Sequence, residues 1–434
     1  MECKNSSLCI FDKPGVLTDI QFCNTVDYYP VNTITPNGPL EFHISGSGED
    51  YIDVNNISLY VAFKILHEDG TDVDQSTDVV GLNNLPISTL FSDAFLKIGE
   101  TQVEGGASDY PYRGYFRTVM QFHPAAQTSQ MSAMGWHKDE ANKFDDATNI
   151  GFVKRKNLVG NSNLIELQGP LFFDFFNQDR HLISQTHLKI KLIPNKPEFL
   201  LNAYYAAPAS GKSPPKFKID FQKVILYVDR LEMNPSVING HKIGLHSQNA
   251  RYFINHTDLF TYTIPAGQLS YTKDNLFSDL SPKMVMIAMV DNDAFNGDIK
   301  KNPFHFQHYN LKNLALTRDG RNIPGMPLEP DFTNKKYLRS YVQTMKAFNY
   351  WNTDDTNGLR PADWAGGYTI YAFDLTPDKE ASSGCLHAHV GNNFRLELKF
   401  EKALPNTINV LVYAITDSQI EITKLRDVIT HYTR

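Results

Sequence analysis

Two histidines one residue apart, His387 and His389, form the pattern in this chain that most resembles a metal site. On a strand, alternation would place both imidazole rings on one face, as a zinc or iron site requires. A third ligand should then follow within about five residues, but the first glutamate is Glu397. We therefore interpret the two histidines as a solvated or interfacial pair, and predict no bound metal.

A second group of possible ligands, Asp291, Asp293 and Asn296-Gly297, offers the oxygen atoms that calcium prefers. The group lacks the alternating spacing and the closing glutamate of a helix-loop-helix calcium site. Aspartate, asparagine and glycine also gather in tight turns, because of the backbone conformations that they allow. We interpret this segment as a turn that follows a strand.

The segment SGKS at 210–213 contains the Gly-Lys-Ser of a phosphate-binding loop. That motif needs an earlier glycine, where Ala206 stands, and a following helix, which Pro214-Pro215 would interrupt. The hydrolase and metalloprotease motifs GxSxG and HExxH do not occur in the sequence. We predict no catalytic residue and no cofactor, and therefore no enzyme.

Two further sets of side chains could contact polyanions or glycans. Lys154-Arg155-Lys156 is the strongest basic run, and we interpret it as a solvated loop rather than a DNA contact. Trp136, Trp351 and Trp364 sit near irregular segments. We expect them to be buried in a core or a subunit contact rather than stacked on sugars.

The totals exclude several classes of protein. A net charge of −7 over 434 residues argues against a protein that mainly binds nucleic acid backbone, so no sequence-specific nucleic acid binding is expected. No apolar run approaches the ~18 residues of a membrane-spanning helix, and no signal peptide is recognisable. The four cysteines, Cys3, Cys9, Cys23 and Cys385, lack zinc-like spacing. Reduced thiols in an intracellular setting are expected.

The segments at 112–122 and 339–348 are two versions of one amphipathic helix. In the first, apolar residues recur at i, i+3, i+4, i+7 and i+8, and the second has a similar stripe. One such helix in each half predicts a duplicated fold. A shift of 226 positions aligns four identical pairs: Arg113 with Arg339, Tyr115 with Tyr341, Thr118 with Thr344, and Phe122 with Phe348.

Strand patterns surround both helices in the same order, about eight in each half. Asp319-Gly320 between two of them predicts a type I′ hairpin. Eight strands that close two sheets over one core form a jelly roll, although periodicity alone leaves a plain sandwich open. The predicted fold is all-β, with two tandem eight-stranded antiparallel jelly rolls and short helices in the loops.

The domain limits follow from two polar segments. Residues 1–27 show no sustained period, and we expect an N-terminal arm outside both cores. The polar, small residues at 234–246 mark the boundary between the halves. The prediction is a first jelly roll at 28–235 and a second, with its connecting segment, at 236–434.

Long motifs in the chain resemble the hexon-like proteins of Polinton (Maverick)-type and adintovirus-type DNA elements. The similarity extends from about Tyr29 to Arg426. The motifs that carry it are GSGEDYIDVNN (46–56), YPYRGY (110–115), IPAGQLSYTKDNLF (264–277), VDNDAFNGDIKKNPFHFQHYNL (290–311), EPDFTNKKYLRSY (329–341) and GYTIYAFDLTPD (367–378).

This resemblance implies a double jelly-roll major capsid protein, found in the virion. It further implies a homotrimeric capsomer of an icosahedral double-stranded DNA virus or virus-like element, with neighbouring capsomers, penton and minor capsid proteins as partners. The family has no catalytic residues to carry over. The alternative is a cupin-like or glycan-binding jelly-roll protein, with His387 and His389 as its ligands.

Overall fold

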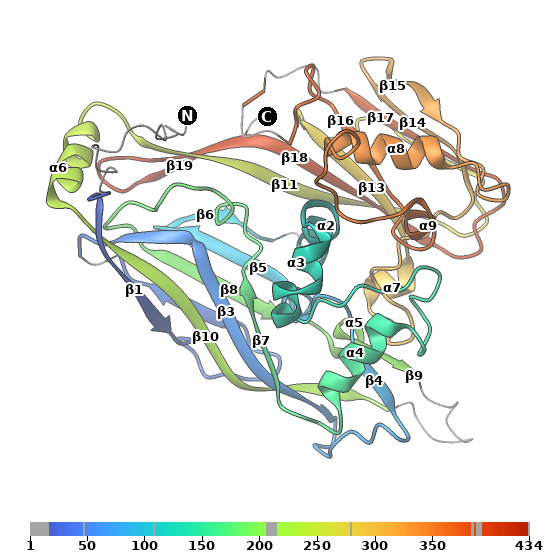
Figure 1. Ribbon diagram of the computed structural model, residues 1–434, viewed down its shortest axis with the longest axis horizontal. Coiled ribbons are helices and arrows are strands. Elements are labelled where there is room, and N and C mark those ends of the chain that lie inside the picture. The colour runs from blue at the N-terminus through green and yellow to red at the C-terminus, as the bar shows by residue number, and fades with distance from the viewer. Residues whose placement is uncertain are drawn as a thin grey trace, which may run out of the picture.

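The computed structural model describes residues 17–432, apart from residues 47, 107–108, 205–214, 278–279, 383–385 and 388–392. Antiparallel sheets make up both halves of the chain (Figure 1). In each half, a pair of sheets encloses apolar side chains.

The first half contains two sheets whose strands do not follow chain order. One sheet has the order β1-β10-β3-β7 and the other β2-β8-β5-β6. Their strands are β1 (Ile20–Tyr28), β2 (Leu40–Ile44), β3 (Tyr51–His67), β5 (Phe91–Ile98), β6 (Thr101–Glu104), β7 (Ile165–Pro170), β8 (Leu188–Pro194) and β10 (Phe217–Met233).

The second half repeats this arrangement with the orders β11-β18-β13-β16 and β12-β17-β14-β15. In both halves, one sheet joins the first, eighth, third and sixth strands, and the other joins the remaining four. This is the jelly-roll order, so the predicted fold class is confirmed. The strands are β11 (Ala250–Ile264), β12 (Ser270–Lys273), β13 (Met284–Asp291), β14 (Leu311–Arg318), β15 (Arg321–Leu328), β16 (Ile370–Asp374), β17 (Phe394–Phe400) and β18 (Ile408–Ile422).

Three further strands and several short helices decorate the two units. β4 (Val79–Leu82) pairs with β9 (Leu201–Tyr204), and β19 (Val428–Tyr432) pairs with β18. The helices lie in the connections: α1 (Pro86–Thr89), α2 (Tyr110–Gln121), α3 (Pro124–Thr128), the 3₁₀ helix η1 (Gln130–Met134), α4 (Ile150–Val159), α5 (Pro197–Leu200), α6 (Pro235–Gly244), α7 (Asn292–Asn296), α8 (Leu338–Ala347) and α9 (Pro361–Ala365). None of the described helices is long and apolar enough to cross a membrane.

The two predicted amphipathic helices are α2 and α8. Each begins the connection between the fifth and sixth strands of its jelly roll, so they occupy equivalent places in the topology. The predicted hairpin is also present, because Asp319 and Gly320 have φ angles of 49° and 76° between β14 and β15. A positive φ at both central residues is the type I′ signature.

The sheet that contains β13 is covered on both faces. Met284, Met286 and Ala288 face the core that extends into the first half, whereas Val285 and Ile287 face the core of the second half. Because successive side chains of a strand point to opposite faces, a strand buried on both faces is apolar throughout. This explains why the sequence of β13 shows no alternation.

Two polar segments contain more structure than we predicted. Residues 20–27, assigned to the arm, form most of β1 and pair with β10, so the arm is shorter than expected. Most side chains of β1 are exposed. Its sequence therefore lacks the alternation of apolar and polar residues that predicts a strand with one buried face. The linker at 234–246 contains α6, where the Asn234 side chain accepts a hydrogen bond from the backbone N–H of Ser236 and caps the helix.

Candidate functional site

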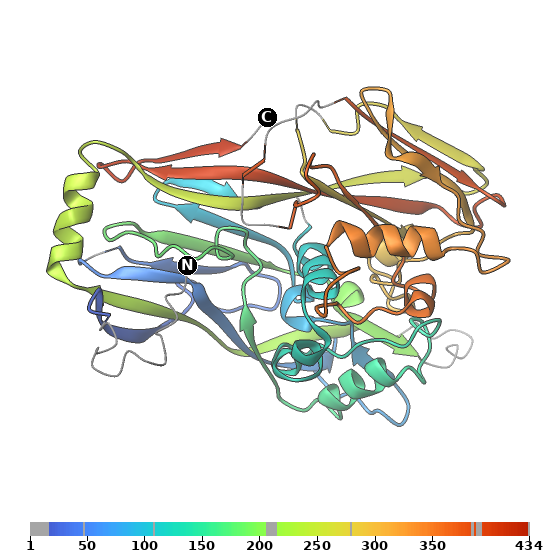
Figure 2. The same cartoon turned by 45° about the horizontal axis from the view of Figure 1, so that its top comes forward.

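Helix α2 lies at the junction between the two jelly rolls (Figure 2). The Tyr115 ring stacks on the Phe304 ring, with their centroids 4.1 Å apart. Phe116 contacts both Phe306 and Tyr413, at centroid distances of 5.2 Å. Since these partners belong to the second half, the apolar stripe of α2 bridges the two units.

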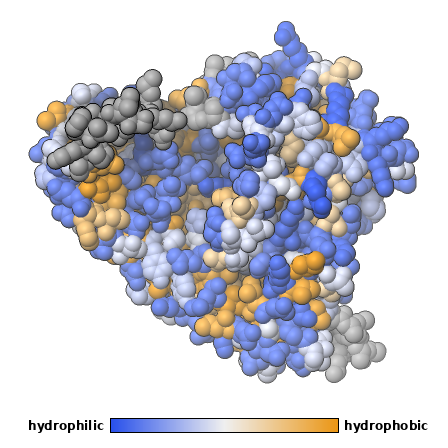
Figure 3. All heavy atoms as spheres, viewed as in Figure 1, coloured by the Kyte–Doolittle hydropathy of each residue, from blue (hydrophilic) through white to orange (hydrophobic). Residues whose placement is uncertain are grey.

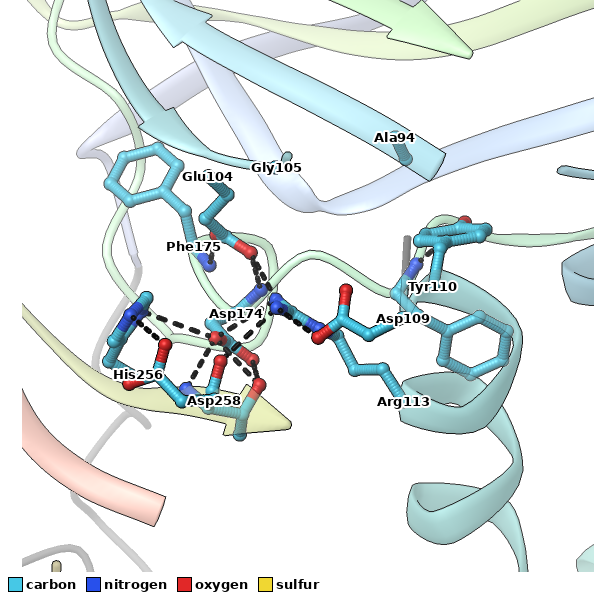
Figure 4. Close-up of polar contacts among 12 residues, drawn as sticks. Ala94, Glu104, Gly105, Asp109, Tyr110, Arg113, Asp174, Phe175, His256 and Asp258 are labelled. Carbon is cyan, nitrogen blue, oxygen red and sulfur yellow. Dashed lines mark hydrogen bonds and ion pairs between the residues drawn. The ribbon is translucent and has the colours of Figure 1, made fainter. Parts of the chain in front are cut away.

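The polar side of the same helix enters a buried ionic group, which we call the Arg113 cluster (Figure 4). Its charged members are Arg113 on α2, Glu104 at the end of β6, Asp109 and Asp174. Arg113 Nη1 lies 2.9 Å from Glu104 Oε2 and 3.3 Å from Asp174 Oδ2, and Nη2 lies 3.3 Å from Asp109 Oδ2. All four side chains are at most 9% exposed.

The Arg113 cluster joins the first half to β11 of the second. Arg113 Nη2 donates a hydrogen bond to the carbonyl oxygen of Thr257 at 3.1 Å. The Thr257 backbone N–H and hydroxyl both donate to Asp174, at 2.8 Å and 2.9 Å. His256 Nδ1 lies 3.6 Å from Asp174 Oδ2, and its Nε2 lies 3.5 Å from Asp258. The two halves are therefore joined at this point by paired charges and by hydrogen bonds to defined atoms of β11.

Glu104 is held by the backbone as well as by Arg113. Its two carboxylate oxygens accept hydrogen bonds from the N–H groups of Asp174 and Phe175, at 2.9 Å and 2.8 Å. Gly105, directly after Glu104, has a φ of +108°, and a Cβ there would lie 2.4 Å from the Ala94 oxygen. Only glycine fits this tight turn, which directs the Glu104 carboxylate into the junction.

The environment changes how two members of this region titrate. Burial, followed by the negative charge of Asp174, raises the pKa of Glu104 to about 7. Burial alone would lower the pKa of His256, but its hydrogen bond to Asp258 and the nearby Asp174 raise it above its ordinary value. Both groups therefore keep a proton to a higher pH than their ordinary pKa values would allow.

The Arg113 cluster is chemically suited to hold the two units together. Its carboxylates are occupied by the guanidinium, by backbone N–H groups and by Thr257. No three or more histidine, cysteine, aspartate or glutamate side chains form a potential metal site within the part of the chain that the structure describes. Separating the members of a buried ionic group leaves uncompensated charge, so the cluster disfavours any packing of the two units that pulls its members apart.

The predicted candidate ligands lie in separate places. His387 is not solvated, because its side chain is 6% exposed and its Nδ1 lies 3.2 Å from Asp417 Oδ2. His389 and the segment 210–213 lie outside the described residues. The calcium-like segment follows β13 as predicted, but it forms the short helix α7 rather than a turn. Asp291 caps α7, and Lys301 forms ion pairs with both Asp291 and Asp293.

The basic run and the tryptophans correct two further expectations. Residues 154–156 belong to helix α4 rather than a loop, and Arg155 is buried, with its Nη2 2.6 Å from Asp139 Oδ1. Trp136 and Trp364 are buried as predicted, but Trp351 is 50% exposed. A charge run in the sequence does not show which of its members will find a buried partner.

The chain was compared with known protein families and with individual proteins. No protein-family model matches this chain. An uncharacterized protein of Caenorhabditis elegans is 24% identical over 426 residues, which cover 95% of this chain and 98% of that protein.

Solved structures of viral capsids share the architecture. A chain in the structure of the Sputnik virophage is similar over 100% of this chain and 92% of its own length, with 15% identity and a TM-score of 0.65. The PBCV-1 virus capsid matches over 98% and 100%, with 12% identity and a TM-score of 0.62. The mavirus major capsid protein matches over 97% and 92%, with 13% identity and a TM-score of 0.57. This chain therefore has the double jelly-roll fold found in these virus capsids.

Proposed function

We propose that this chain is a major capsid protein, which forms trimeric pseudo-hexagonal capsomers of an icosahedral double-stranded DNA virus or virus-like element. The observation that carries the proposal is the match to capsid structures over nearly the whole chain, so that both jelly rolls are included. The role is structural rather than enzymatic, and the site of action is the virion.

The duplicated fold supports the trimer. We assign one jelly roll to residues 20–235, which include β1, and the other to 236–434. Three chains then place six similar units around a threefold axis, which gives a near-hexagonal tile. Such tiles would contact neighbouring capsomers, and penton and minor capsid proteins would complete the shell.

Exposed apolar side chains are available for contacts between subunits. In the face shown in Figure 3, apolar residues gather over β1 and again around α3 and α4. Phe22 on β1 is 60% exposed, and Ile150 on α4 is 57% exposed. Permanent subunit interfaces are commonly larger than transient ones, and they are more apolar than the rest of the protein surface. We propose that assembly covers these residues.

Light scattering and electron microscopy test the proposal. The full-length chain should form a particle of three times 49.2 kDa, or 147.6 kDa, with little folded monomer at micromolar concentration. Electron microscopy of concentrated protein should show hexagonal tiles or closed shells. A stable monomer near 49.2 kDa that never assembles would contradict a capsid role.

A further inference from the structure

Lys283, directly before β13, places a buried amine against two different side chains. Only 4% of its side chain is exposed. Its Nζ lies 2.7 Å from Asp417 Oδ1 and donates a hydrogen bond of 2.7 Å to Asn255 Oδ1. One lysine nitrogen thus contacts both a carboxylate and a carboxamide.

Strand pairing in the sheet brings Lys283, Asn255 and Asp417 together. β11, β18 and β13 are neighbours, and they carry or adjoin the three residues. Asn255 and Asp417 are direct partners in the register of β11 and β18. Lys283 is held beside β18 because its backbone N–H donates to the Ile415 oxygen at 2.8 Å. Side chains of directly opposed residues lie close together on one face of a sheet, so the three groups are positioned by regular structure.

Asp417 is oriented by a fourth residue. Its Oδ2 accepts a hydrogen bond of 2.8 Å from the backbone N–H of His387, and it lies 3.2 Å from Nδ1 of the same residue. This contact leaves Oδ1 directed at Lys283. The carboxyl group is therefore fixed where it can exchange a proton with the amine.

We propose that Lys283 and Asn255 become joined by an intramolecular isopeptide bond, with Asp417 as the proton carrier. A proton first passes from Nζ to Asp417 Oδ1, which lies 2.7 Å away, and this leaves a neutral amine. The amine attacks Cγ of Asn255, as a positioned nucleophile. A bond forms between Nζ and Cγ, and the bond from Cγ to Nδ2 breaks.

The proton balance needs no cofactor or oxidant. Asp417 transfers a proton from the attacking nitrogen to Nδ2, which leaves as ammonia. Overall, a lysine ammonium and a carboxamide become a secondary amide and an ammonium ion. Asn255 is exposed, whereas only 9% of the Asp417 side chain is, so ammonia can leave to solvent while the proton carrier stays enclosed.

A second lysine in the same half provides an internal comparison. Lys301 lies 2.9 Å from Asp291 Oδ1, and the Asn406 side chain donates to the same carboxylate at 3.1 Å. The residue types match those around Lys283. However, 31% of the Lys301 side chain is exposed, and the Asn406 contact is made through its Nδ2 to Asp291. We expect no bond at Lys301.

Mass spectrometry of the purified full-length chain tests the inference. The intact mass should fall below the sequence mass by one ammonia molecule, about 17 Da. Trypsin should fail to cleave after Lys283, and should yield one branched species that joins peptides 252–273 and 274–300. The variants Lys283→Arg and Asp417→Asn should have their full sequence masses, whereas Lys301→Arg should keep the deficit.

The wild-type measurement decides the question even if a variant does not fold. An intact mass equal to the sequence mass, unchanged after days at neutral pH, would overturn the inference. So would a deficit that maps to residues other than Lys283 and Asn255. Neither outcome bears on the proposed capsid role, which rests on assembly.

Discussion

Arg113 and Arg339 occupy equivalent positions in the two repeated helices but very different surroundings. Arg113 faces three buried carboxylates, whereas Arg339 is exposed and donates to the Met326 oxygen at 3.3 Å. Removing one side of a buried ionic group leaves uncompensated charge, so Arg113→Gln should lower the free energy of unfolding by about 3–5 kcal/mol. Arg339→Gln should change it by less than about 0.5 kcal/mol. Urea unfolding of both variants measures this, and equal losses would contradict the assigned role.

Glu104 should make the free energy of unfolding depend on pH in a defined direction. Its pKa is raised to about 7 in the folded chain, from 4.5 in the unfolded chain. Folding therefore favours the protonated form, and this stability is present at pH 4.5 and is lost as the pH rises through about 7. The raised pKa of His256 acts in the same direction.

The chain should accordingly resist urea better at pH 5.5 than at pH 8. In the Glu104→Gln variant, which cannot ionise at this position, the difference between the two pH values should be smaller. Unfolding midpoints at several pH values test the slope. An unchanged slope in the variant would show that other groups cause the dependence.

The Arg113 cluster could not have been found from the sequence. Arg113 appeared there only as one of four identities with the second helix, and Arg339 shows that the identity carries no information about burial. Glu104, Asp174 and Thr257 lie on three distant segments. Their meeting depends on how the two units pack, which no local pattern encodes.

Among the strands and helices, those with a regular pattern of buried and exposed residues could be predicted from the sequence. β8 and β17 alternate cleanly between buried and more exposed residues, which is the pattern that predicts a strand from sequence. β1 has almost no buried face, and α6 buries only Ile238, so neither produced a periodic signal. A strand or helix that lies on the surface is positioned by hydrogen bonds and caps rather than by its apolar face.

Strand β1 leads to a prediction about the N-terminal segment. Deleting residues 1–28 removes β1 and opens the edge of β10, whereas deleting residues 1–16 leaves the strand in place. The longer deletion should reduce the free energy of unfolding by about 1–3 kcal/mol, since several backbone hydrogen bonds are lost. An open edge also promotes aggregation. Denaturant unfolding and light scattering of both truncations would test this, and equal behaviour would argue that β1 is dispensable.

For the whole molecule, the sheet shared between the two cores predicts that the halves unfold together. Residues 248–434 expressed alone would present Met284, Met286, Ala288 and Val290 to water. Exposed apolar surface of this kind leads to aggregation. The full chain should show one unfolding transition in calorimetry, and the isolated second half should be insoluble. Two separate transitions would contradict the shared core.

Charge gives a prediction for assembly. A chain with a net charge of −7 gives a trimer with three times that charge, −21. Repulsion between trimers is screened by salt over about 8 Å at physiological ionic strength. Association of trimers into larger tiles should therefore strengthen as sodium chloride is raised, which light scattering can follow. Association that weakens with salt would indicate that attractive ion pairs dominate the contacts.

The double burial of β13 also bears on the history of the chain. Two copies of a self-sufficient jelly roll can be exchanged, separated or deleted, because each keeps a polar outer face. In this chain the sheet of the second copy has an apolar outer face, and the first copy covers it. The second unit therefore depends on the first to keep this face out of water. The side chains at Met284 and Met286 must therefore fit the first unit as well as their own sheet.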